Sequence, residues 1–388
     1  MPSVYLHSLA TRNPEHAYSQ ESAGEMLTGQ LEPGGRGQRL SQRIYRHSGI
    51  DQRHSVISGY LPGQGDGVFF DGDSGDFLSP TTGTRNAKYV EAAKPLFVDT
   101  ARDALEASPF SAHEVTHVIT VSCTGFFAPG PDYYILRDLG LPSNTQRYHI
   151  GFMGCFAAFP ALRMAASFCK NDPDAVVLIV CLELCTLHLE PSDVIDNIIA
   201  CSVFADGAAS VVVSAQAPDG PIALVAAGGD STAGATAVEF VDSVTQLAPD
   251  SENDMAWKIG DRGFEMVLST YVPKILGAQI GGIVDDLLGQ SGRRREDIAH
   301  WWVHPGGRAI LDHIHQGLKL DPEALAPSRR VLSRFGNMSS ATILFVLQEA
   351  LAGGGGPGPS GDVEAGDLAY AMAFGPGLTV ESALLRGV

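Results

Sequence analysis

The stretch Ala175-Val176-Val177-Leu178-Ile179-Val180-Cys181 is a continuous apolar run with the length of one β-strand. Two similar runs flank it: HVITVS at 117–122 lies upstream, and AASVVV at 208–213 follows the turn signal Ala205-Asp206-Gly207. Helical patterns separate the first two runs. Because strands that are apolar along their whole length are covered on both faces, these runs predict a sheet enclosed between helices.

The second half of the chain repeats this order, in which a helical pattern is followed by an apolar strand. These segments lie at residues 264–288, 298–303, 340–351 and 369–374. The similar order of elements predicts a duplicated α/β unit, with a boundary near residues 215–225 where Ala217-Pro218-Asp219-Gly220 interrupts the pattern. We therefore expect residues 1–220 and 221–388 to form two halves of one body.

The first hundred residues are less regular. A strand at 3–9 precedes a helix, residues 31–86 are rich in Gly, Ser, Asp and Arg and are expected to form loops, and a helix at 87–105 contains Pro95. Near the other end, the glycine-rich segment at 353–361 is expected to be a flexible surface connection.

Composition narrows the class of protein. The 388 residues are 44% hydrophobic and 18% charged, as in a compact soluble protein, and the net charge of −18 disfavours nucleic acid and anionic membrane surfaces. The longest apolar run spans eight residues, whereas a membrane-spanning helix needs about 20. Six irregularly spaced cysteines and the lack of a signal-peptide pattern predict a cytoplasmic protein with no nucleic acid partner and no membrane insertion.

One cysteine stands at a position suited to nucleophilic chemistry. Gly151-Phe152-Met153-Gly154-Cys155 comes directly before a helical pattern at 156–169. The partial positive charge at a helix N-terminus favours thiolate over thiol, so Cys155 is a candidate nucleophile. Free cysteines are more often small buried apolar residues, and the local sequence does not distinguish the two interpretations.

Two further motifs place polar side chains at the ends of regular segments. His304 follows an apolar strand and precedes the turn Pro305-Gly306-Gly307, and Asn337 stands after Gly336 ahead of a helical pattern. Loop residues at strand ends often carry the catalytic groups of α/β proteins. The structural alternatives are a histidine bonded to backbone and an asparagine that caps the helix.

Together these motifs resemble those of the chalcone synthase-like type III polyketide synthases. The matching strings are GFMGC, VFADGAA, HPGG, GNMSSAT and FGPGLTVE, which occur in the family's order between about Tyr45 and Glu381. The initiation ketosynthases of fatty acid synthesis also use Cys, His and Asn. They lack the HPGG and FGPG motifs around these residues, so the resemblance to them is weaker.

The resemblance implies a fold, an assembly and a chemistry. The expected fold is α/β, a thiolase-type five-layer αβαβα arrangement of two duplicated halves, and the expected assembly is a homodimer. Acyl-CoA and malonyl-CoA would be substrates, with no cofactor and no metal. Cys155 would hold the acyl group with its thiolate paired to His304, and Asn337 with His304 would stabilise an enolate formed by decarboxylation.

The resemblance also assigns residues around the substrate. Phe204 and Phe264 match two gatekeeper phenylalanines between the CoA tunnel and the cavity, and Ala128 matches a position that reaches into the partner subunit's cavity. Matches to cavity-lining, cyclisation or HPGG positions are Thr124, Glu183, Cys185, His188, Ser339, Gly306 and Gly307. A zinc site at Cys181, Cys185 and His188 is disfavoured because three ligands are too few for a closed site.

Some residues depart from the plant enzymes of this family. Cys185 and His188 stand where plant chalcone synthases have threonine. The strings ELCTLH at 183–188 and WKIGD at 257–261 are similar to those of bacterial alkylresorcinol and alkylpyrone synthases, which take fatty acyl starters. We therefore expect a fatty acyl starter and an alkylpyrone or alkylresorcinol product.

The phosphates of coenzyme A require cations despite the acidic net charge. Arginines are concentrated in residues 36–53, and within this stretch Arg46 and Arg53 are expected to contact the nucleotide by resemblance to the family. The run Arg293-Arg294-Arg295 is expected to be a solvated surface.

Two other activities use the same residue types. A stand-alone ketosynthase could join two β-ketoacyl chains from acyl carrier proteins into an α-pyrone, with the same three catalytic residues. A cysteine hydrolase acting on thioesters would need only the Cys–His pair, and Asn337 argues against it because an enolate needs a second donor.

Overall fold

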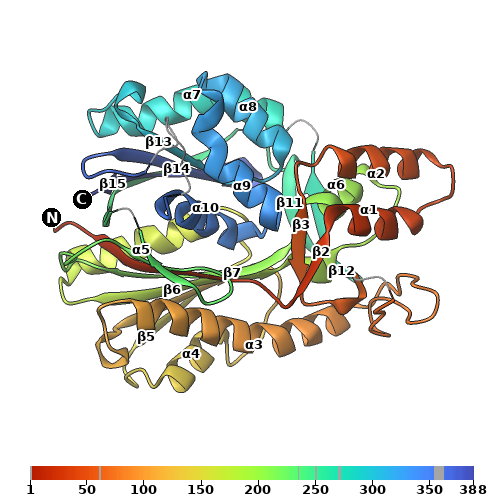
Figure 1. The fold of residues 1–388 in the computed structure, drawn as a ribbon, viewed down its shortest axis with the longest axis horizontal. Coiled ribbons are helices and arrows are strands. Elements are labelled where there is room, and N and C mark those ends of the chain that lie inside the picture. Colours follow the sequence, from red (N-terminus) through yellow and green to blue (C-terminus); the bar gives the residue numbers. More distant parts are fainter. Residues whose placement is uncertain (1, 61–62, 235, 250, 270–271, 354–361) are drawn as a thin grey trace.

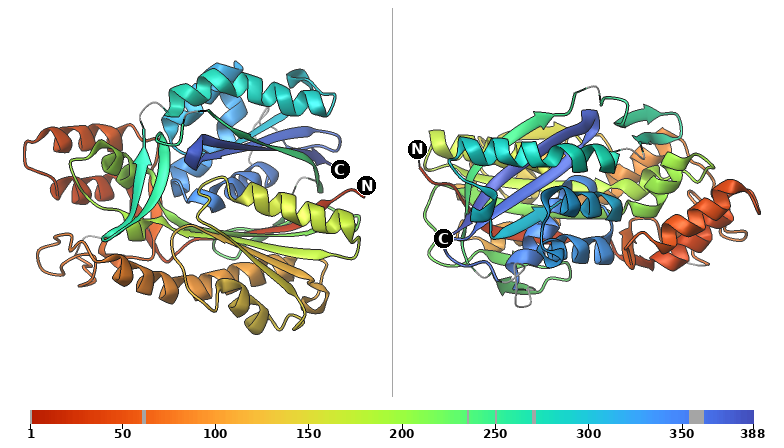
Figure 2. Two further views of the ribbon diagram at one scale, coloured as in Figure 1. Left: turned by 180° about the vertical axis from the view of Figure 1, so that it is seen from behind. Right: turned by 90° about the horizontal axis from the view of Figure 1, so that it is seen from above.

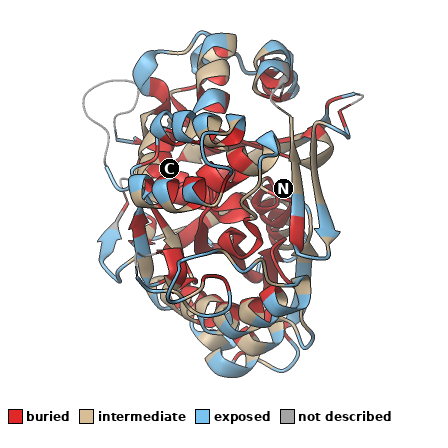
Figure 3. Cartoon of the chain, turned by 90° about the vertical axis from the view of Figure 1, so that its right-hand side faces the viewer, coloured by how far each residue is buried: buried red, intermediate tan, exposed pale blue. Residues whose placement is uncertain are grey.

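The computed structural model describes residues 2–60, 63–234, 236–249, 251–269, 272–353 and 362–388. Helices and sheets alternate in five layers, as the helices at the top, middle and bottom of Figure 1 show with a sheet between each pair. Figure 3 shows that buried residues concentrate between the layers, whereas the outer faces of the surrounding helices are exposed. The five-layer αβαβα fold expected from the resemblance is confirmed.

The N-terminal sheet contains the three apolar runs found in the sequence. Its strands, in spatial order, are β1 (Tyr5–Arg12), β7 (Asp206–Ser214), β6 (Val176–Leu184), β4 (His117–Ser122) and β5 (Gln146–Gly151). Strand β4 is parallel to β5 and β6, and β7 is antiparallel to β6 and β1. Every residue of β4, β6 and β7 is buried, as their continuous apolar sequences predict.

The C-terminal sheet lies on the other side of the central helices. Its strands are β13 (His300–Val303), β14 (Leu368–Gly375), β15 (Thr379–Gly387) and β10 (Val238–Leu247). The register of β10 against β1 pairs Tyr5 with Glu239 and Leu6 with Val238, which joins the two sheets. Short strands β8 (Ala223–Val225) and β9 (Ser231–Ala233) follow the expected boundary at 220, yet β8 pairs with β1.

Helices cover both sheets and fill the space between them (Figures 1 and 2). Helices α5 (Ala158–Asn171) and α10 (Thr342–Leu351) form the central layer, and α3 (Thr82–Ala107) with α4 (Pro131–Leu139) cover the N-terminal sheet. The remaining large helices are α7 (Val272–Gln290), α8 (Arg308–Leu318) and α9 (Ala326–Phe335). Nine of the ten residues of α10 are buried, which is typical of a helix enclosed on all sides.

Smaller elements gather at the end of the molecule opposite the two termini (Figure 1). They are β2 (His16–Ser19), α1 (Gln20–Gly29), α2 (Arg36–Arg46), β3 (Gln52–Ser55), α6 (Ile195–Val203), β11 (Met255–Gly260) and β12 (Gly263–Leu268). Single 3₁₀ turns lie at Ser58–Tyr60, Ala112–Glu114, Cys185–His188, Arg295–Asp297, Pro322–Leu325, Ser339–Ala341 and Pro376–Leu378.

Three sequence-based expectations need correction or lie outside the described residues. The expected loop region at 31–86 contains α2 and β3, because a stretch rich in Gly and Arg can still bury one helical face. The helix expected at 264–288 begins only at Val272, and residues 263–268 form β12, in which alternate side chains share a face. Of the glycine-rich segment, residues 354–361 lie outside the described ranges.

Candidate active site

The candidate nucleophile lies on a tight loop between β5 and α5. Gly154 has φ of +85°, and a Cβ there would come within 2.5 Å of the Pro376 ring, so a glycine is required next to Cys155. The expected helix begins at Ala158, three residues beyond Cys155. The close packing of the two loops brings the FGPG turn near the C-terminus against the GFMGC loop.

His304 continues the edge strand β13 into the HPGG turn. Its backbone N–H donates to the Met372 carbonyl at 2.8 Å, which extends the pairing with β14 by one residue. The side chain is buried, and within the described residues neither ring nitrogen has a hydrogen-bond partner. Burial lowers the pKa of His304 to about 3, so the imidazole is neutral.

Asn337 is held by backbone bonds on both sides. Its N–H donates to the Val203 carbonyl at 2.8 Å, and its carbonyl accepts from Ala205 at 2.9 Å, so it pairs in parallel with Phe204. In the side chain, Oδ1 accepts from the Ser339 N–H at 2.8 Å. This bond directs Nδ2 toward the HPGG turn, where it lies 3.3 Å from the Gly306 carbonyl.

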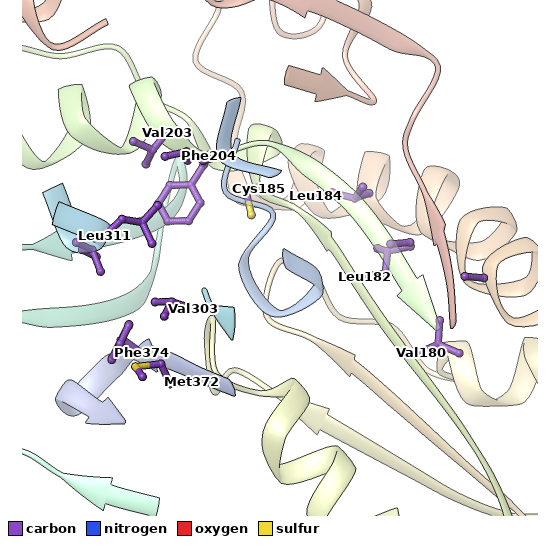
Figure 4. Close-up of a cluster of buried hydrophobic side chains, with 14 of the residues drawn as sticks. Val180, Leu182, Leu184, Cys185, Val203, Phe204, Val303, Leu311, Met372 and Phe374 are labelled. Carbon is purple, nitrogen blue, oxygen red and sulfur yellow. The ribbon is translucent and has the colours of Figure 1, made fainter. Parts of the chain in front are cut away.

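One cavity contains all three side chains. Its lining residues are Cys123, Thr124, Gly154, Cys155, Cys185, Phe204, Met255, Ala256, Trp257, Met266, Leu268, His304, Gly306, Ile310, Asn337, Ser339, Phe374 and Pro376. Figure 4 shows how β6 leads to Cys185 beside Phe204, with Val303 and Phe374 farther along the same cluster. Residues that lie as far apart in the sequence as Cys123 and Pro376 therefore line the same cavity.

Burial shifts the pKa values of both Cys155 and His304. Burial raises the pKa of Cys155 to about 11, while hydrogen bonds to Ser339 and Asn337 partly offset this effect. Among the described residues no hydrogen bond joins Cys155 to His304. Burial therefore favours the neutral thiol and the neutral imidazole, which opposes the expected imidazolium–thiolate pair.

Glu183 lies behind the cavity wall. It accepts hydrogen bonds from Ser340 Oγ at 2.6 Å, Thr124 Oγ1 at 2.9 Å and the Cys123 N–H at 3.0 Å. Burial raises its pKa, and these donors oppose that shift. Glu183 therefore orders the loop at 122–124 and the 3₁₀ turn Ser339–Ala341 ahead of α10, whereas Thr124 and Ser339 themselves line the cavity.

His188 has a role that the sequence did not indicate. Its Nε2 donates to the Thr124 carbonyl at 2.7 Å, and its Nδ1 accepts from the Phe264 N–H at 3.0 Å. The imidazole also stacks on the Phe264 ring, with centroids 4.0 Å apart. Burial lowers the pKa of His188 to about 3, so it is a neutral bridge and does not line the catalytic cavity.

The two phenylalanines expected between the CoA tunnel and the cavity, Phe204 and Phe264, do not line the same cavities. Phe204 lines both the catalytic cavity and a second cavity of about 500 Å³, whereas Phe264 lines only the second. The hairpin β11–β12 forms the wall between the catalytic cavity and the second cavity. Trp257 Nε1 anchors this hairpin by donating to the Cys123 carbonyl at 2.8 Å.

The arginines expected to bind nucleotide phosphates are placed differently. Arg53 is fully buried, donates to the carbonyls of Cys201 and Phe204 at 2.8 and 2.7 Å, and lies over the Tyr18 and Tyr45 rings. A guanidinium inside the protein cannot contact a nucleotide at the surface, so this expectation is wrong for Arg53. Its bonds instead hold the backbone beside Phe204.

A third cavity, of about 530 Å³, opens from the catalytic site toward α2. It shares Leu268, Gly306 and Ile310 with the catalytic cavity, and Gly307 lies at its edge. Its lining includes two arginines, Arg43 and Arg308, together with His47. Arg46 is exposed and lines a separate groove between α1 and α2, whereas Arg43 and Arg308 line the third cavity.

Ala128 lies on the surface of the chain. It is exposed and does not line the catalytic cavity of its own subunit. Exposed apolar side chains, Phe126 and Met153, are found near the same loops. The exposed position of Ala128 leaves it able to contact a partner subunit, and Ala128 does not line the catalytic cavity of its own chain.

Sequence reasoning missed several residues that line the catalytic cavity. They are Met255, Ala256, Met266, Leu268 and Ile310. A signal was present, since apolar residues at 264, 266 and 268 alternate as they do in a strand.

In the described part of the chain, no group of three His, Cys, Asp or Glu is placed to hold a metal, and no helix is long and apolar enough to cross a membrane.

Two family models match this chain. Residues 42–217 match the N-terminal domain of chalcone and stilbene synthases, and residues 239–388 match the C-terminal domain. The chain belongs to the chalcone and stilbene synthase family. The prediction of a type III polyketide synthase, an acyltransferase of the ketosynthase type, is confirmed.

Several relatives match nearly the whole length of the chain. The α-pyrone synthesis polyketide synthase-like protein Pks18 of Mycobacterium tuberculosis is 30% identical over 380 residues, which cover 98% of this chain and 90% of that protein. Among solved structures, 1,3,6,8-tetrahydroxynaphthalene synthase of Streptomyces coelicolor matches with a TM-score of 0.84 and 27% identity over 99% of both chains. The type III domain of Steely1 from Dictyostelium matches with a TM-score of 0.86 and 26% identity, over 100% of this chain and 99% of that domain.

Proposed function

We propose that this polyketide synthase condenses malonyl-CoA with a fatty acyl starter held on Cys155 and closes the product to an α-pyrone. The observation that carries the proposal is the single cavity lined by Cys155, His304 and Asn337. The relative Pks18 is named for α-pyrone synthesis, which favours a pyrone over a resorcinol.

Loading of the starter requires a proton acceptor beside the thiol. Because burial keeps His304 neutral and its ring nitrogens have no other partner in the described structure, one of them is free to take the Cys155 proton. The sulfur then attacks the acyl carbonyl, the thiolate of coenzyme A leaves, and that thiolate takes the proton from His304. The acyl group remains on Cys155 as a thioester.

Extension requires two hydrogen-bond donors for a thioester oxygen. Asn337 Nδ2 and the N–H of His304 supply them, and the bond from Ser339 to Asn337 Oδ1 fixes the orientation of the amide. When malonyl-CoA loses CO₂, the electron pair of the broken bond moves into an enolate whose oxygen these donors stabilise. The enolate carbon attacks the acyl carbonyl, and the Cys155 sulfur departs as the leaving group.

The walls of the catalytic cavity fit an alkyl chain. Met255, Trp257, Met266 and Leu268 come from the hairpin β11–β12, and Ile310 comes from α8. The catalytic cavity is small, about 50 Å³, but the second cavity adjoins it through side chains lining both. A long starter would extend into the inner part of the second cavity, because the outer part carries charged side chains. These are Glu190, Lys258, Asp261, Arg262 and Glu265.

A homodimer is part of the proposal. Strand β5 forms one edge of the large sheet and pairs only with β4 in the described structure, so its other edge is free to meet a second copy. Exposed Phe126 and Met153 lie close to this edge, and Ala128 would then face the partner subunit. Analytical ultracentrifugation should give twice the 41.0 kDa mass of one chain.

The expected compartment is the cytoplasm. The six cysteines, Cys123, Cys155, Cys169, Cys181, Cys185 and Cys201, are all free. Free cysteines support a cytoplasmic location, because its reducing conditions keep the nucleophilic thiol available.

The starter profile tests the proposed function. Purified enzyme is incubated with malonyl-CoA and acyl-CoA starters from six to sixteen carbons, and kcat/KM is measured for each. Each buried methylene contributes at most about 0.8 kcal/mol, so kcat/KM should rise by up to about fourfold per methylene until the cavity ends. A flat profile would refute the fatty acyl starter. Free acid alone would indicate a hydrolase, and turnover only with two carrier-bound chains would indicate the stand-alone ketosynthase.

A further inference from the structure

Helix α2 carries an arginine stripe, defined as Arg36, Arg39, Arg43 and Arg46. Positions separated by three, seven and ten residues fall on one side of an α-helix, and all four side chains are exposed. The buried residues Gly37, Ser41 and Tyr45 occupy the opposite side. The stripe therefore faces solvent along the full length of the helix, in a protein whose net charge is −18.

No arginine of the stripe has an acidic partner among the described residues. Across the described residues, twelve other arginines form ion pairs with Asp or Glu, and none of the four does. Arg39 donates only to the carbonyl of Gly34. What sets the stripe apart is that four arginines without an acidic partner lie together on one exposed face of a helix, where a molecule outside the chain can reach them.

Helix stability does not explain the stripe. Arg43 and Arg46 lie in the last turn, where the helix dipole favours cations, but Arg36 and Arg39 lie in the first turns, where it disfavours them. The first turn contains no acidic residue to compensate. The helix dipole therefore gives no reason for Arg36 and Arg39 at this end of the helix, and a ligand of opposite charge would supply one.

The stripe leads to the entrance of the active site. Arg43 lines the third cavity, which joins the catalytic cavity at Gly306 and Ile310. With a rise of 1.5 Å per residue, Arg36 lies about 10 Å beyond Arg43 along the helix axis. A nucleotide bound at Arg43 and Arg308 would occupy the entrance only, so the outer half of the stripe needs a longer acidic surface.

Resting on the proposed function, we infer that the arginine stripe docks an acidic acyl carrier protein, whose phosphopantetheine arm enters the third cavity and delivers the acyl starter to Cys155. In that transfer the Cys155 sulfur forms the new thioester, the carrier thiol leaves, and the proton of Cys155 passes to the departing sulfur. Figures 1 and 2 show that α2 projects from one end of the molecule, where a second protein has free access.

The test compares two forms of one starter. Dodecanoyl-CoA and dodecanoyl carried by an acidic holo acyl carrier protein are each supplied with malonyl-CoA to the wild type and to R36E/R39E. We expect the variant to raise KM for the carrier-bound starter by about tenfold or more, and to change kcat/KM for dodecanoyl-CoA by less than about twofold. R293E/R294E is the matched control, because it reverses the same number of exposed charges elsewhere and should change neither value.

The outcomes separate this inference from the proposed function. Turnover of dodecanoyl-CoA without any turnover of the carrier-bound starter would overturn the docking inference and leave the polyketide synthase activity intact. Equal effects of R36E/R39E and R293E/R294E would also overturn it, since only net charge would then matter. If neither starter is extended by the wild type, the fatty acyl function itself fails. A KM for the carrier that rises with salt in the wild type, and less so in R36E/R39E, would support the inference.

Discussion

Replacing His188 by alanine should loosen the hairpin β11–β12 that separates the catalytic cavity from the second cavity. The imidazole bonds Thr124 and the Phe264 N–H at 2.7 and 3.0 Å and stacks on the Phe264 ring. Each hydrogen bond contributes about 0.5–1.5 kcal/mol and the stacked pair about 0.5–1.5 kcal/mol, so His188→Ala should weaken this attachment by about 1.5–4.5 kcal/mol.

The functional consequence of His188→Ala follows from the cavity walls. Cys185 and Trp257 line both cavities, and removal of the imidazole opens the space behind them. We expect the optimum starter length to increase and the distribution of products to broaden, with kcat/KM for six-carbon starters changed little. Product chain lengths are measured by liquid chromatography and mass spectrometry, and the free energy of unfolding by urea titration.

A conservative variant separates bonding from packing. In His188→Gln the side-chain amide offers one donor and one acceptor, so it should retain part of the stability and the wild-type length optimum. His113→Ala, at an exposed position, serves as the control and should change neither quantity. The reasoning is refuted if His188→Ala keeps the wild-type product lengths and loses less than about 0.5 kcal/mol of stability, because neither bond nor stack would then hold the hairpin.

Three other predictions concern the catalytic residues and the response to pH. Cys155→Ala should show no acyl adduct by intact-protein mass spectrometry after incubation with acyl-CoA, and an adduct that persists would exclude Cys155 as the carrier of the acyl group. Asn337→Ala should slow malonyl-CoA decarboxylation by about 10²–10³ while Cys155 still loads, whereas His304→Ala should impair both steps; equal loss of loading would contradict this division of roles. Burial lowers the pKa of His188 and His304 to about 3, so the unfolded chain binds more protons below pH of about 6.5, and urea titrations should show stability falling as the pH drops from there toward 3.

The sequence alone predicted a sheet covered on both faces and named the candidate catalytic residues. Runs such as 117–122 and 175–181 are apolar throughout, and only burial on both faces of a sheet accommodates such strands. Cys155, His304 and Asn337 were found because each stands in a distinctive glycine-containing motif, and such motifs are local. The geometry then supplied the reason for these glycines, for example the contact between Gly154 and Pro376.

Only the tertiary structure decided what surrounds these residues. Arg53 looked like a surface cation, but it is buried against Cys201 and Phe204, which lie about 150 residues away. His188 matched a cavity position, and it bridges Thr124 and Phe264 while lining the second cavity and not the catalytic one. Local patterns report which face of a segment is apolar, whereas a buried polar side chain must find its partners wherever the fold brings them. Its role therefore depends on contacts between distant parts of the chain, and no local pattern records those contacts.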